Sequence, residues 1–590
     1  MNIQEIKETS IWELYEKGRN YHRRMGYYED SDRNYRMYNG DQWNGAKLGD
    51  AEPVQKNFIK PIVKYKVSVV HDNLYAINYS SQNYENRQFQ KEASRYCDLL
   101  NGYMRRLWEN DKLDFYGRRV TKDAAINGEG IMYVGFDQKK MKPIHEILKK
   151  VDVYYGNEND DNIQAQPYIL IRKRMPVSNA IELALNEGMS DEKTGFIIGD
   201  NDTFEESGDA AKEELDNQVT VVYKMYKQND TVHYSVATRW CDITEDVDTG
   251  LTHYPIAHFV WEEKEGSARG EGEVKYLIPN QIEVNRTEMR RVLTVKQQAY
   301  PMKVVDISKI DNPEAINTVG GTIRTNGAPV DDVHKIVGTI PPAQMSSDVK
   351  LLVDDLIQIS RELAGAGDVA TGSVNPEDAS GRAILAVQQA TQSPLTEQKE
   401  SYKNFIEDIA TIDLEYFVVY AENGVDMQEE VTDPMTGEEY IQMVNVPQTV
   451  LQQLQAVVKI DITPKGVYDR FAMEQTMENF LMNGFFNPQR VAEFEAYVKA
   501  LPDDSVAPKQ DLLEGIENVK KTQEQIAQMK AQTQMALQRA QRFLNEDPDG
   551  QAQEISDAEE QLRMQEAQYA EQEAGLDAEV AEEVENVDDN

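Results

Sequence analysis

The protein has 590 residues, of which 40% are hydrophobic, and its formal net charge is −41. This length is too great for one simple core, so we expect several domains. Static DNA-binding proteins neutralise phosphates with Lys and Arg, so the acidic balance argues against that class, although it leaves open a surface past which DNA slides.

The first half of the chain mixes helical and strand patterns, which indicates an α+β domain. Apolar spacings of three and four residues predict helices over Ile11–Met25, Gln88–Trp108 and Leu113–Ile126. The third of these ends at Asn127-Gly128, a favourable C-cap. Alternating patterns predict strands at Ile131–Phe136, Gln166–Arg174, Gln218–Tyr226, Thr231–Arg239 and Ile256–Trp261. The polar stretch Tyr155–Asn162 is predicted to be a surface loop.

The rest of the chain is organised around Gly270–Val387. Two predicted helices, Glu273–Gln298 and Ser347–Leu363, flank an insert with short β-like runs at Lys303–Asp306, Gly320–Thr325 and Lys335–Ile340. A small, polar loop without Lys or Arg follows at Gly365–Ser380, and such long loops are often functional. A long helical pattern, with a possible kink at Pro394, covers Gly381–Glu422.

The two flanking helices carry apolar stripes and opposite charges. One stripe consists of Val274, Leu277, Ile278, Ile282, Met289 and Leu293, and the other of Val349, Leu352, Val353, Leu356, Ile359 and Leu363. The first helix is basic at Arg286 and Arg290, and the second is acidic at Asp354 and Asp355. The two helices are therefore expected to face each other through complementary apolar stripes, and on pattern alone an ordinary antiparallel helix pair inside a monomer is the favoured explanation.

The C-terminal region begins with a hairpin pattern at Met427–Tyr440 and a strand at Val457–Ile462. Helical patterns follow at 470–483, 489–500 and 516–544. From Asn545 onward the only basic residue is Arg563. This acidic, Gln-rich tail is expected to be partly helical at best and disordered at its end.

Motifs for catalysis are missing from the sequence. There is no GxxxxGK[ST], HExxH or GxSxG, and Gly270-Glu271-Gly272 is a lone GxG before a helix. The two cysteines, Cys97 and Cys241, lie in no CxxC or Cys/His cluster, which disfavours disulfides and zinc and fits a reducing compartment. We therefore expect no enzyme, no cofactor, no catalytic residue and no bound metal. Apolar runs are too short to span a bilayer, so no membrane partner is expected.

Six segments in order resemble a known family. They are Tyr38–Trp43 (YNGDQW), Asn127–Asp137 (NGEGIMYVGFD), Tyr254–Trp261 (YPIAHFVW), Gly270–Asn285 (GEGEVKYLIPNQIEVN), Gly365–Leu385 (GAGDVATGSVNPEDASGRAIL) and Val458–Phe471 (VKIDITPKGVYDRF). Together they resemble the portal proteins of tailed bacteriophages, which form the head-to-tail connector ring. No single motif is highly specific, and their joint order carries the resemblance.

The resemblance implies an α+β fold with wing, stem, clip and crown, a helical stem and a mainly helical C-terminal region. Carried onto this chain, it implies a wing at 1–268 and 423–465, stem helices at 269–300 and 346–364, a clip at 301–345, a tunnel loop at 365–380, a long wing helix at 381–422, a crown at 466–544 and a tail at 545–590. The tail departs from the family's short-crown pattern.

The resemblance also implies a ring of about twelve subunits at the unique capsid vertex, through which the genome is packaged and ejected. Its partners would be double-stranded DNA bound without sequence specificity, the large terminase subunit, a neck protein, the major capsid protein and the scaffold. It would occupy the virion, and the host cytoplasm during assembly.

Site residues follow from the same resemblance. The DNA-facing tunnel loop would present Asp368, Val369, Thr371, Ser373, Asn375 and Glu377. The subunit interface of the stem would use Arg286, Arg290, Asp354 and Asp355, and docking at the clip would use Lys309, Arg324, Asp331 and Asp332. Two other hypotheses stay open, a metal-dependent DNA-processing enzyme that uses the acidic pairs, and another structural phage assembly protein.

Overall fold

The computed structural model describes most of the chain up to residue 464. The described residues are 3–48, 51–71, 73–81, 87–200, 217–318, 320–326, 336–341, 345–346, 348–366, 393–432 and 439–464, with isolated helical positions between 477 and 520. The chain divides into two compact units, Met1–Thr463 and Pro464–Asn590. The described residues combine helices with sheets, which confirms the predicted α+β class.

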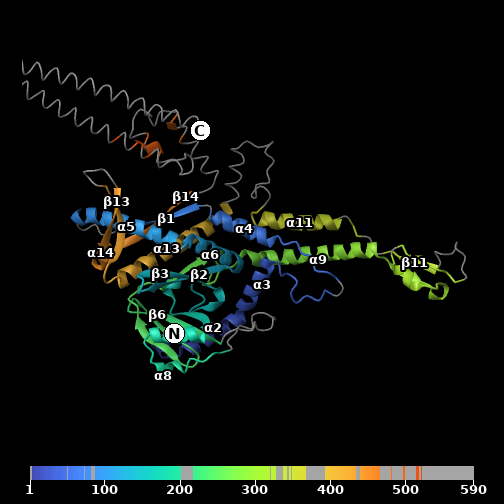
Figure 1. Cartoon of the computed structure of the whole chain (residues 1–590), viewed down its shortest axis with the longest axis horizontal. Helices are drawn as coiled ribbons and strands as arrows, with labels where there is room; N and C mark the ends of the chain where they lie inside the picture. The colour runs from blue at the N-terminus through green and yellow to red at the C-terminus, as the bar shows by residue number, and fades with distance from the viewer. Residues whose placement is uncertain are drawn as a thin grey trace, which may run out of the picture. The chain divides into compact units, whose positions relative to one another are not determined.

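The first unit contains the named elements (Figure 1). Its α-helices are α1 (Ile3–Glu8), α2 (Ile11–Met25), α3 (Tyr27–Asn39), α4 (Ile59–Val70), α5 (Arg87–Asn110), α6 (Leu113–Asn127), α7 (Val177–Asn186), α8 (Asp191–Thr194), α9 (Glu273–Ala299), α11 (Asp348–Leu363), α13 (Thr396–Tyr420) and α14 (Gln448–Leu454). Short 3₁₀ turns are η1 (Lys150–Asp152), η2 (Ile163–Ala165), η3 (Ile307–Lys309), η4 (Pro313–Asn317) and η6 (Ser393–Leu395).

The strands form five sheets within the described residues. They are β1 (Asn73–Ser81), β2 (Glu129–Asp137), β3 (Lys142–Leu148), β4 (Val153–Tyr155), β5 (Ile169–Pro176), β6 (Gln218–Gln228), β7 (Thr231–Ala237), β8 (Asp242–Asp248), β9 (Ile256–Val260), β10 (Met302–Val305), β11 (Val337–Ile340), β12 (Val425–Thr432), β13 (Glu439–Val446) and β14 (Ala456–Pro464). Their orders are β1-β14, β10-β11, β12-β13, β3-β2-β9 and β4-β5-β6-β7-β8. Within the described residues, the neighbouring strands of the last four of these sheets are antiparallel.

The central three-stranded sheet uses both faces because side chains alternate along β2. On one face, the Phe136 ring stacks on Tyr416 of α13 with ring centroids 5.4 Å apart, and Gly130 leaves room for Val120 of α6. On the other face, Lys173 of β5 lies 4.8 Å from the ring of Tyr133. The sheet therefore separates helices α6 and α13 from the five-stranded sheet.

The five-stranded sheet is also covered on both faces, and neighbouring residues of one strand show this. Val222 of β6 packs against Leu14 and Tyr15 of α2. Val221, one residue earlier, packs against Ala180 and Ala184 of α7. Both clusters are buried, so the alternating side chains of β6 are covered on both faces of the sheet, and neither face is exposed to solvent.

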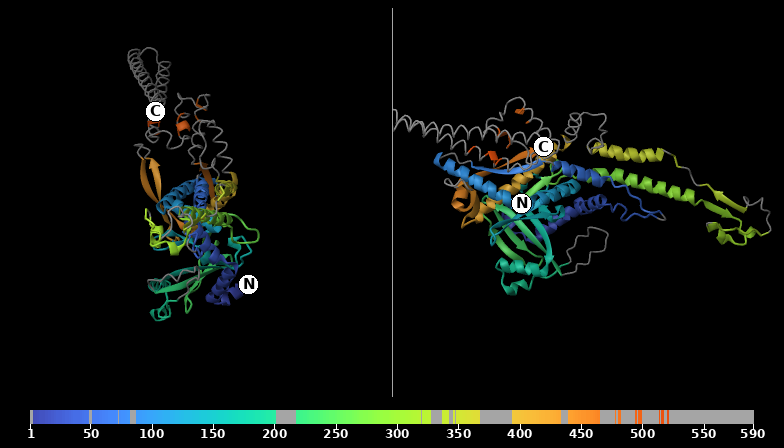
Figure 2. Two further views of the ribbon diagram at one scale, coloured as in Figure 1. Left: turned by 90° about the vertical axis from the view of Figure 1, so that its right-hand side faces the viewer. Right: turned by 45° about the horizontal axis from the view of Figure 1, so that its top comes forward.

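Helices α9 and α11 contact each other, and the ribbon β10–β11 lies in the chain between them (Figure 1; Figure 2, right). In the ribbon, Met302 pairs with Ile340 and Val305 with Val337. The helices predicted at Glu273–Gln298 and Ser347–Leu363 are confirmed. Of the three predicted β-like runs, the first and third pair, and within the second only Thr325 makes a bridge, to Ile310.

Most other predicted elements in the described residues are confirmed to within a few residues. Two predictions need correction. The helix that contains the second half of 381–422 begins at Thr396, and Pro394 lies in the 3₁₀ turn before it rather than at a kink within it; residues 381–392 lie outside the described residues. A short strand, β4, occupies 153–155 and includes the first residue of the predicted loop Tyr155–Asn162.

The second unit is described only at single positions. Met477, Phe494, Tyr497, Val498 and Ile516 are helical and form a small buried cluster. The Phe494 and Tyr497 rings stack with centroids 6.3 Å apart. These positions agree with the helices predicted around 470–483 and 489–500, and the remaining residues of those helices and of 545–590 lie outside the described residues.

Candidate functional site

The chain enters α9 through a segment of close backbone contacts, Arg269–Gly272, which we call the α9 entry. Gly128 has φ +101° at the C-terminus of α6, and a Cβ there would collide with the carbonyl of Gly270. A Cβ on Gly272 would lie 2.5 Å from the carbonyl oxygen of Ile126. Only glycine allows two backbones to approach this closely. The lone GxG and the Asn127-Gly128 pair are thus two halves of one crossing.

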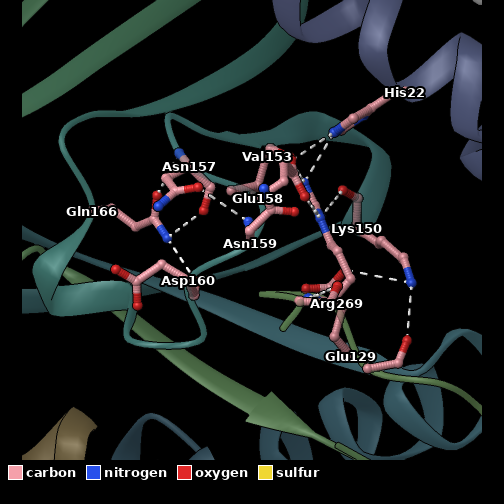
Figure 3. A network of polar contacts seen from close by, with 12 residues as sticks. His22, Glu129, Lys150, Val153, Asn157, Glu158, Asn159, Asp160, Gln166 and Arg269 are labelled. Atoms are coloured by element: carbon pink, nitrogen blue, oxygen red, sulfur yellow. Dashed lines mark hydrogen bonds and ion pairs between the residues drawn. The ribbon is translucent and has the colours of Figure 1, made fainter. Parts of the chain in front are cut away.

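Arg269 stands at the start of the α9 entry and is almost fully buried (Figure 3). Its guanidinium donates to both carboxylate oxygens of Glu158, at 2.9 Å each, and to Glu129 at 2.9 Å. It also donates to the carbonyl oxygens of Lys150 at 3.0 Å and Val153 at 2.6 Å. Five donors in a rigid fork match this arrangement, which a lysine could not reproduce.

His22 of α2 completes the cluster as an acceptor. Its Nε2 lies 3.0 Å from Nη2 of Arg269 and 3.4 Å from Glu158. Burial lowers the pKa of His22 from 6.5 to about 4, against the opposing effect of Glu158, so the ring is neutral at pH 7. Because a neutral Nε2 that accepts from Arg269 carries no proton, the contact with Glu158 is not a second hydrogen bond.

Two further side chains, His258 and Lys150, support Glu129. Glu129 accepts from His258 of β9 at 2.9 Å and lies 3.5 Å from Lys150, whose Nζ donates to the carbonyl of Asn127 at 2.9 Å. Burial alone would raise the pKa of Glu129, but Arg269 and Lys150 hold it far below its usual range. The carboxylates are therefore ionised, and the α9 entry is tied to α2, β2, η1, β4 and β9.

The loop that carries Glu158 corrects one sequence-based expectation. Tyr155–Asn162 was expected to lie on the surface, and this holds for Asn157, Asn159, Asp161 and Asn162, which are exposed, but Tyr155 is buried and Glu158 faces Arg269. Gln166 holds the inner side of this loop, because its side chain accepts from the amide of Asn157 and donates to the carbonyls of Asn157 and Asp160, each at 2.9 Å. No sequence motif signals this cluster.

Two side chains on the next turns of α9 bind the extended segment before α4. The Gln281 amide accepts from the backbone N–H of Phe58 at 3.0 Å and donates to the carbonyl of Lys56 at 2.7 Å. Asn285 accepts from the N–H of Lys56 at 3.1 Å. These side chains replace backbone partners that an irregular segment lacks, and they hold α9 against α4.

The contact between α9 and α11 is narrow. Val353 and Ser360 are the buried residues of α11, and Asn280 of α9 donates to Ser360 Oγ at 2.9 Å. Leu352, Ile359 and Leu363, which belong to the predicted stripe, are exposed, as is Leu351. The expectation that the two stripes face each other is therefore wrong for half of the α11 stripe, because α9 covers only one side of α11.

The charged residues predicted for this helix pair are exposed. Arg286 and Arg290 lie on α9, and Asp354 and Asp355 on α11. None of the four makes a side-chain hydrogen bond or ion pair among the residues that the structure describes. On α9, Glu288 instead binds Lys56 at 2.7 Å and Arg291 at 3.0 Å. A subunit-interface role for the four residues stays a prediction.

The ribbon bears an apolar outer face. Met302 and Val304 alternate on β10 and are exposed, as are Ile340, which pairs with Met302, and the preceding Tyr300 at 84%. Of the residues predicted for docking, Lys309 lies 3.5 Å from Asp306 and the N–H of Arg324 binds Asn312. Asp331 and Asp332 lie outside the described residues, and so do all the predicted tunnel-loop residues, Asp368, Val369, Thr371, Ser373, Asn375 and Glu377.

Metal sites and membrane-spanning helices are both absent from the part of the chain that the structure describes. No group of three or more His, Cys, Asp or Glu side chains there could hold a metal ion. None of the described helices combines the length and apolar character that a membrane crossing requires.

Comparison with known proteins assigns the chain to a class. Residues 19–580 match the model of the family described as Phage P22-like portal protein. The match extends over nearly the whole chain and defines a phage portal protein, a structural component of the phage particle. The chain belongs to the phage P22-like portal protein family, which confirms the recognition made from sequence. A search of curated proteins found no match.

Proposed function

We propose that twelve copies of this chain form a ring at the unique vertex of the capsid, and that the ring is the channel for genome packaging and ejection. Helices α9 and α11 act as the stem, with the wing at 1–268 and 423–465. The ribbon β10–β11 belongs to the clip, which docks the terminase motor and later the neck and tail proteins. The tunnel loop, crown and tail are assigned as the family resemblance implies.

The exposed side of α11 is the observation that carries this proposal. Leu351, Leu352, Ile359 and Leu363 leave a row of large apolar side chains without cover in a single chain. Burying one leucine or isoleucine stabilises a contact by about 1.5–3 kcal/mol. A neighbouring stem helix is the partner of the right shape, because in a ring each subunit meets the next through two different faces.

Charge supports passage rather than retention of DNA. Twelve copies at −41 each carry roughly 500 negative charges before counterions bind. A channel of the same sign as DNA repels phosphates and gives no sequence-specific contact. Within 365–380, the sequence contains no Lys or Arg. The ring would therefore let DNA slide through its channel. It would assemble with capsid and scaffold proteins in the host cytoplasm and then reside in the virion.

Electron microscopy of the purified chain tests the proposal. We expect end-on views of closed rings with a central channel. Ile359→Asp places a charge on the exposed side of α11 and should prevent rings without unfolding the chain, whereas Glu362→Asp, on the same helix and already charged, should leave them unchanged. Chains that stay single under all assembly conditions, or rings that tolerate Ile359→Asp, would refute it.

A further inference from the structure

The outer side of α6 is an unusual surface in so acidic a chain. Phe115 is 59% exposed, and Arg118 and Arg119 beside it are exposed. The Arg119 guanidinium lies 6.0 Å from the ring of Phe115 and 5.9 Å from that of Tyr116. With Lys122 on the next turn, these residues make what we call the α6 basic surface.

The cations of this surface form no ion pair in the described residues, since no carboxylate there contacts Arg118, Arg119 or Lys122 directly. Of the two acids on the same helix, Asp114 accepts from the indole of Trp108 at 3.0 Å and Asp123 accepts from the hydroxyl of Tyr35 at 2.6 Å. Burial raises the pKa of Asp123, and the bond to Tyr35 and the nearby charges of Lys122 and Arg119 oppose this rise. Exposed aromatic residues flanked by arginines are typical of protein interfaces.

A second surface of the same chain has the complementary character. Asn404, Glu407 and Asp408 of α13 line a hollow of about 420 Å³ together with Thr411, Gln164 and His253, and Ile412 adds an apolar side chain to its lining. Neither Glu407 nor Asp408 makes an ion pair within the described residues.

Two basic side chains next to the hollow already have hydrogen-bond partners. His253 binds Glu415 at 3.1 Å, and Lys227 binds Gln164 at 3.2 Å. The hollow thus presents free carboxylates around a partly apolar interior. We call it the α13 hollow.

We propose that the α6 basic surface of one chain docks into the α13 hollow of the next, with Phe115 entering the hollow and Arg118, Arg119 and Lys122 facing Glu407 and Asp408. This contact rests on the proposed ring and identifies a second copy of this chain as the partner of both surfaces. A contact between two different faces repeats from subunit to subunit and closes when the rotation fits. It adds a specific contact outside the helix pair α9–α11.

The volumes and charges agree with this assignment. The hollow has a volume of about 420 Å³, which is above the roughly 300 Å³ at which small-ligand pockets begin. It therefore has room for the aromatic side chain of Phe115. Three cations meet two carboxylates, and an Arg that is already stacked on an aromatic ring binds a carboxylate with little further ordering. Opposite potentials on the two faces also disfavour pairing of like faces, which sets the direction of the ring.

A charge exchange in the full-length chain tests the proposal. We expect Arg119→Glu and Asp408→Lys each to raise the protein concentration needed for half-maximal ring formation at least about tenfold, because each places like charges opposite one another. The double variant should recover most of this loss. Phe115→Ala should weaken assembly without changing its salt dependence, whereas Lys139→Glu, the same charge change on the turn between β2 and β3, should have no effect.

Ring formation is followed by mass photometry, and circular dichroism verifies that each variant is folded. If the wild type forms rings and the single variants form them at the same protein concentration, this contact is overturned and the proposed function is not affected. Double variants that assemble no better than either single variant would also overturn it. A wild type that never forms rings would overturn both proposals.

Discussion

Replacing Arg269 by methionine tests whether the buried cluster holds the α9 entry in place. The substitution keeps much of the volume but removes the donor of three hydrogen bonds to carboxylates, two to backbone carbonyls and one to His22. Glu129 retains His258 and Lys150, whereas Glu158 loses both of its strong donors. A carboxylate that is left buried and unpaired costs about 3–5 kcal/mol.

The pKa of Glu158 gives an independent magnitude. Burial on its own would raise this pKa, but Arg269 lowers it from 4.5 to about 2. Such a shift corresponds to about 3 kcal/mol at 1.36 kcal/mol per pKa unit. A depressed carboxylate pKa stabilises the fold above pH 4.5, and this stabilisation disappears as the pH falls through about 2. The Arg269→Met penalty should therefore be full at pH 7 and shrink in acid.

Urea unfolding at several pH values measures the penalty from the shift of the midpoint. Arg105→Met on α5 is the matched control, because Arg105 is exposed and makes no side-chain hydrogen bond or ion pair among the described residues, and it should change stability by less than about 0.5 kcal/mol. A loss below about 1 kcal/mol for Arg269→Met at pH 7, or a loss that does not diminish between about pH 4.5 and 2, would refute the reasoning.

Three further predictions concern assembly, pH and backbone. Reversing the charge of Arg290 by Arg290→Glu should impair ring formation but not monomer stability, and native mass spectrometry that shows normal rings would contradict it. Burial lowers the pKa of His145, but Asp413 at 3.1 Å raises it more, so the net pKa lies above 6.5. The stability lost in His145→Gln should be largest below pH 6.5 and should decline as the pH rises through the pKa of the folded state. A difference in unfolding free energy between wild type and variant that is the same at every pH would rule this out. Gly128→Ala should cost more than about 2 kcal/mol of stability, because the added Cβ collides with a carbonyl group and the backbone φ is positive. Gly26→Ala, at φ +73° with open space around it, should cost only about 1 kcal/mol. Equal losses in thermal unfolding would show that the close backbone contact is unimportant.

Local elements were predictable because their signals are local. The end of α6 at Asn127-Gly128 follows from one C-cap, and the hairpin β6–β7 from one turn between two alternating runs. Periodicity also placed α9 and α11, but it could not say which side of α11 is covered. Spacing shows which side chains share a face, and only the position of the neighbouring helix decides whether that face is buried.

The cluster around Arg269 could not be predicted for a related reason. His22 and Arg269 lie 247 residues apart in the sequence, and Glu129 and Arg269 lie 140 apart. Without an alignment, nothing links an isolated arginine to acids at such distances. The polar composition of Tyr155–Asn162 predicted that the whole loop is exposed to solvent. The composition could not show that the side chain of Gln166 binds the loop backbone and holds Glu158 toward Arg269. The predicted docking and tunnel-loop residues came from family resemblance alone.

The glycine crossing between Gly128 and Gly270 has a consequence for how the chain matures. The two contacting backbones are separated by 142 positions, so closing this contact costs loop entropy, which pairing within the intervening sheets reduces. Helix α9 cannot take its final direction before this contact closes. If α11 meets a neighbouring chain as proposed above, its exposed side reaches the position for that contact only after the crossing has formed.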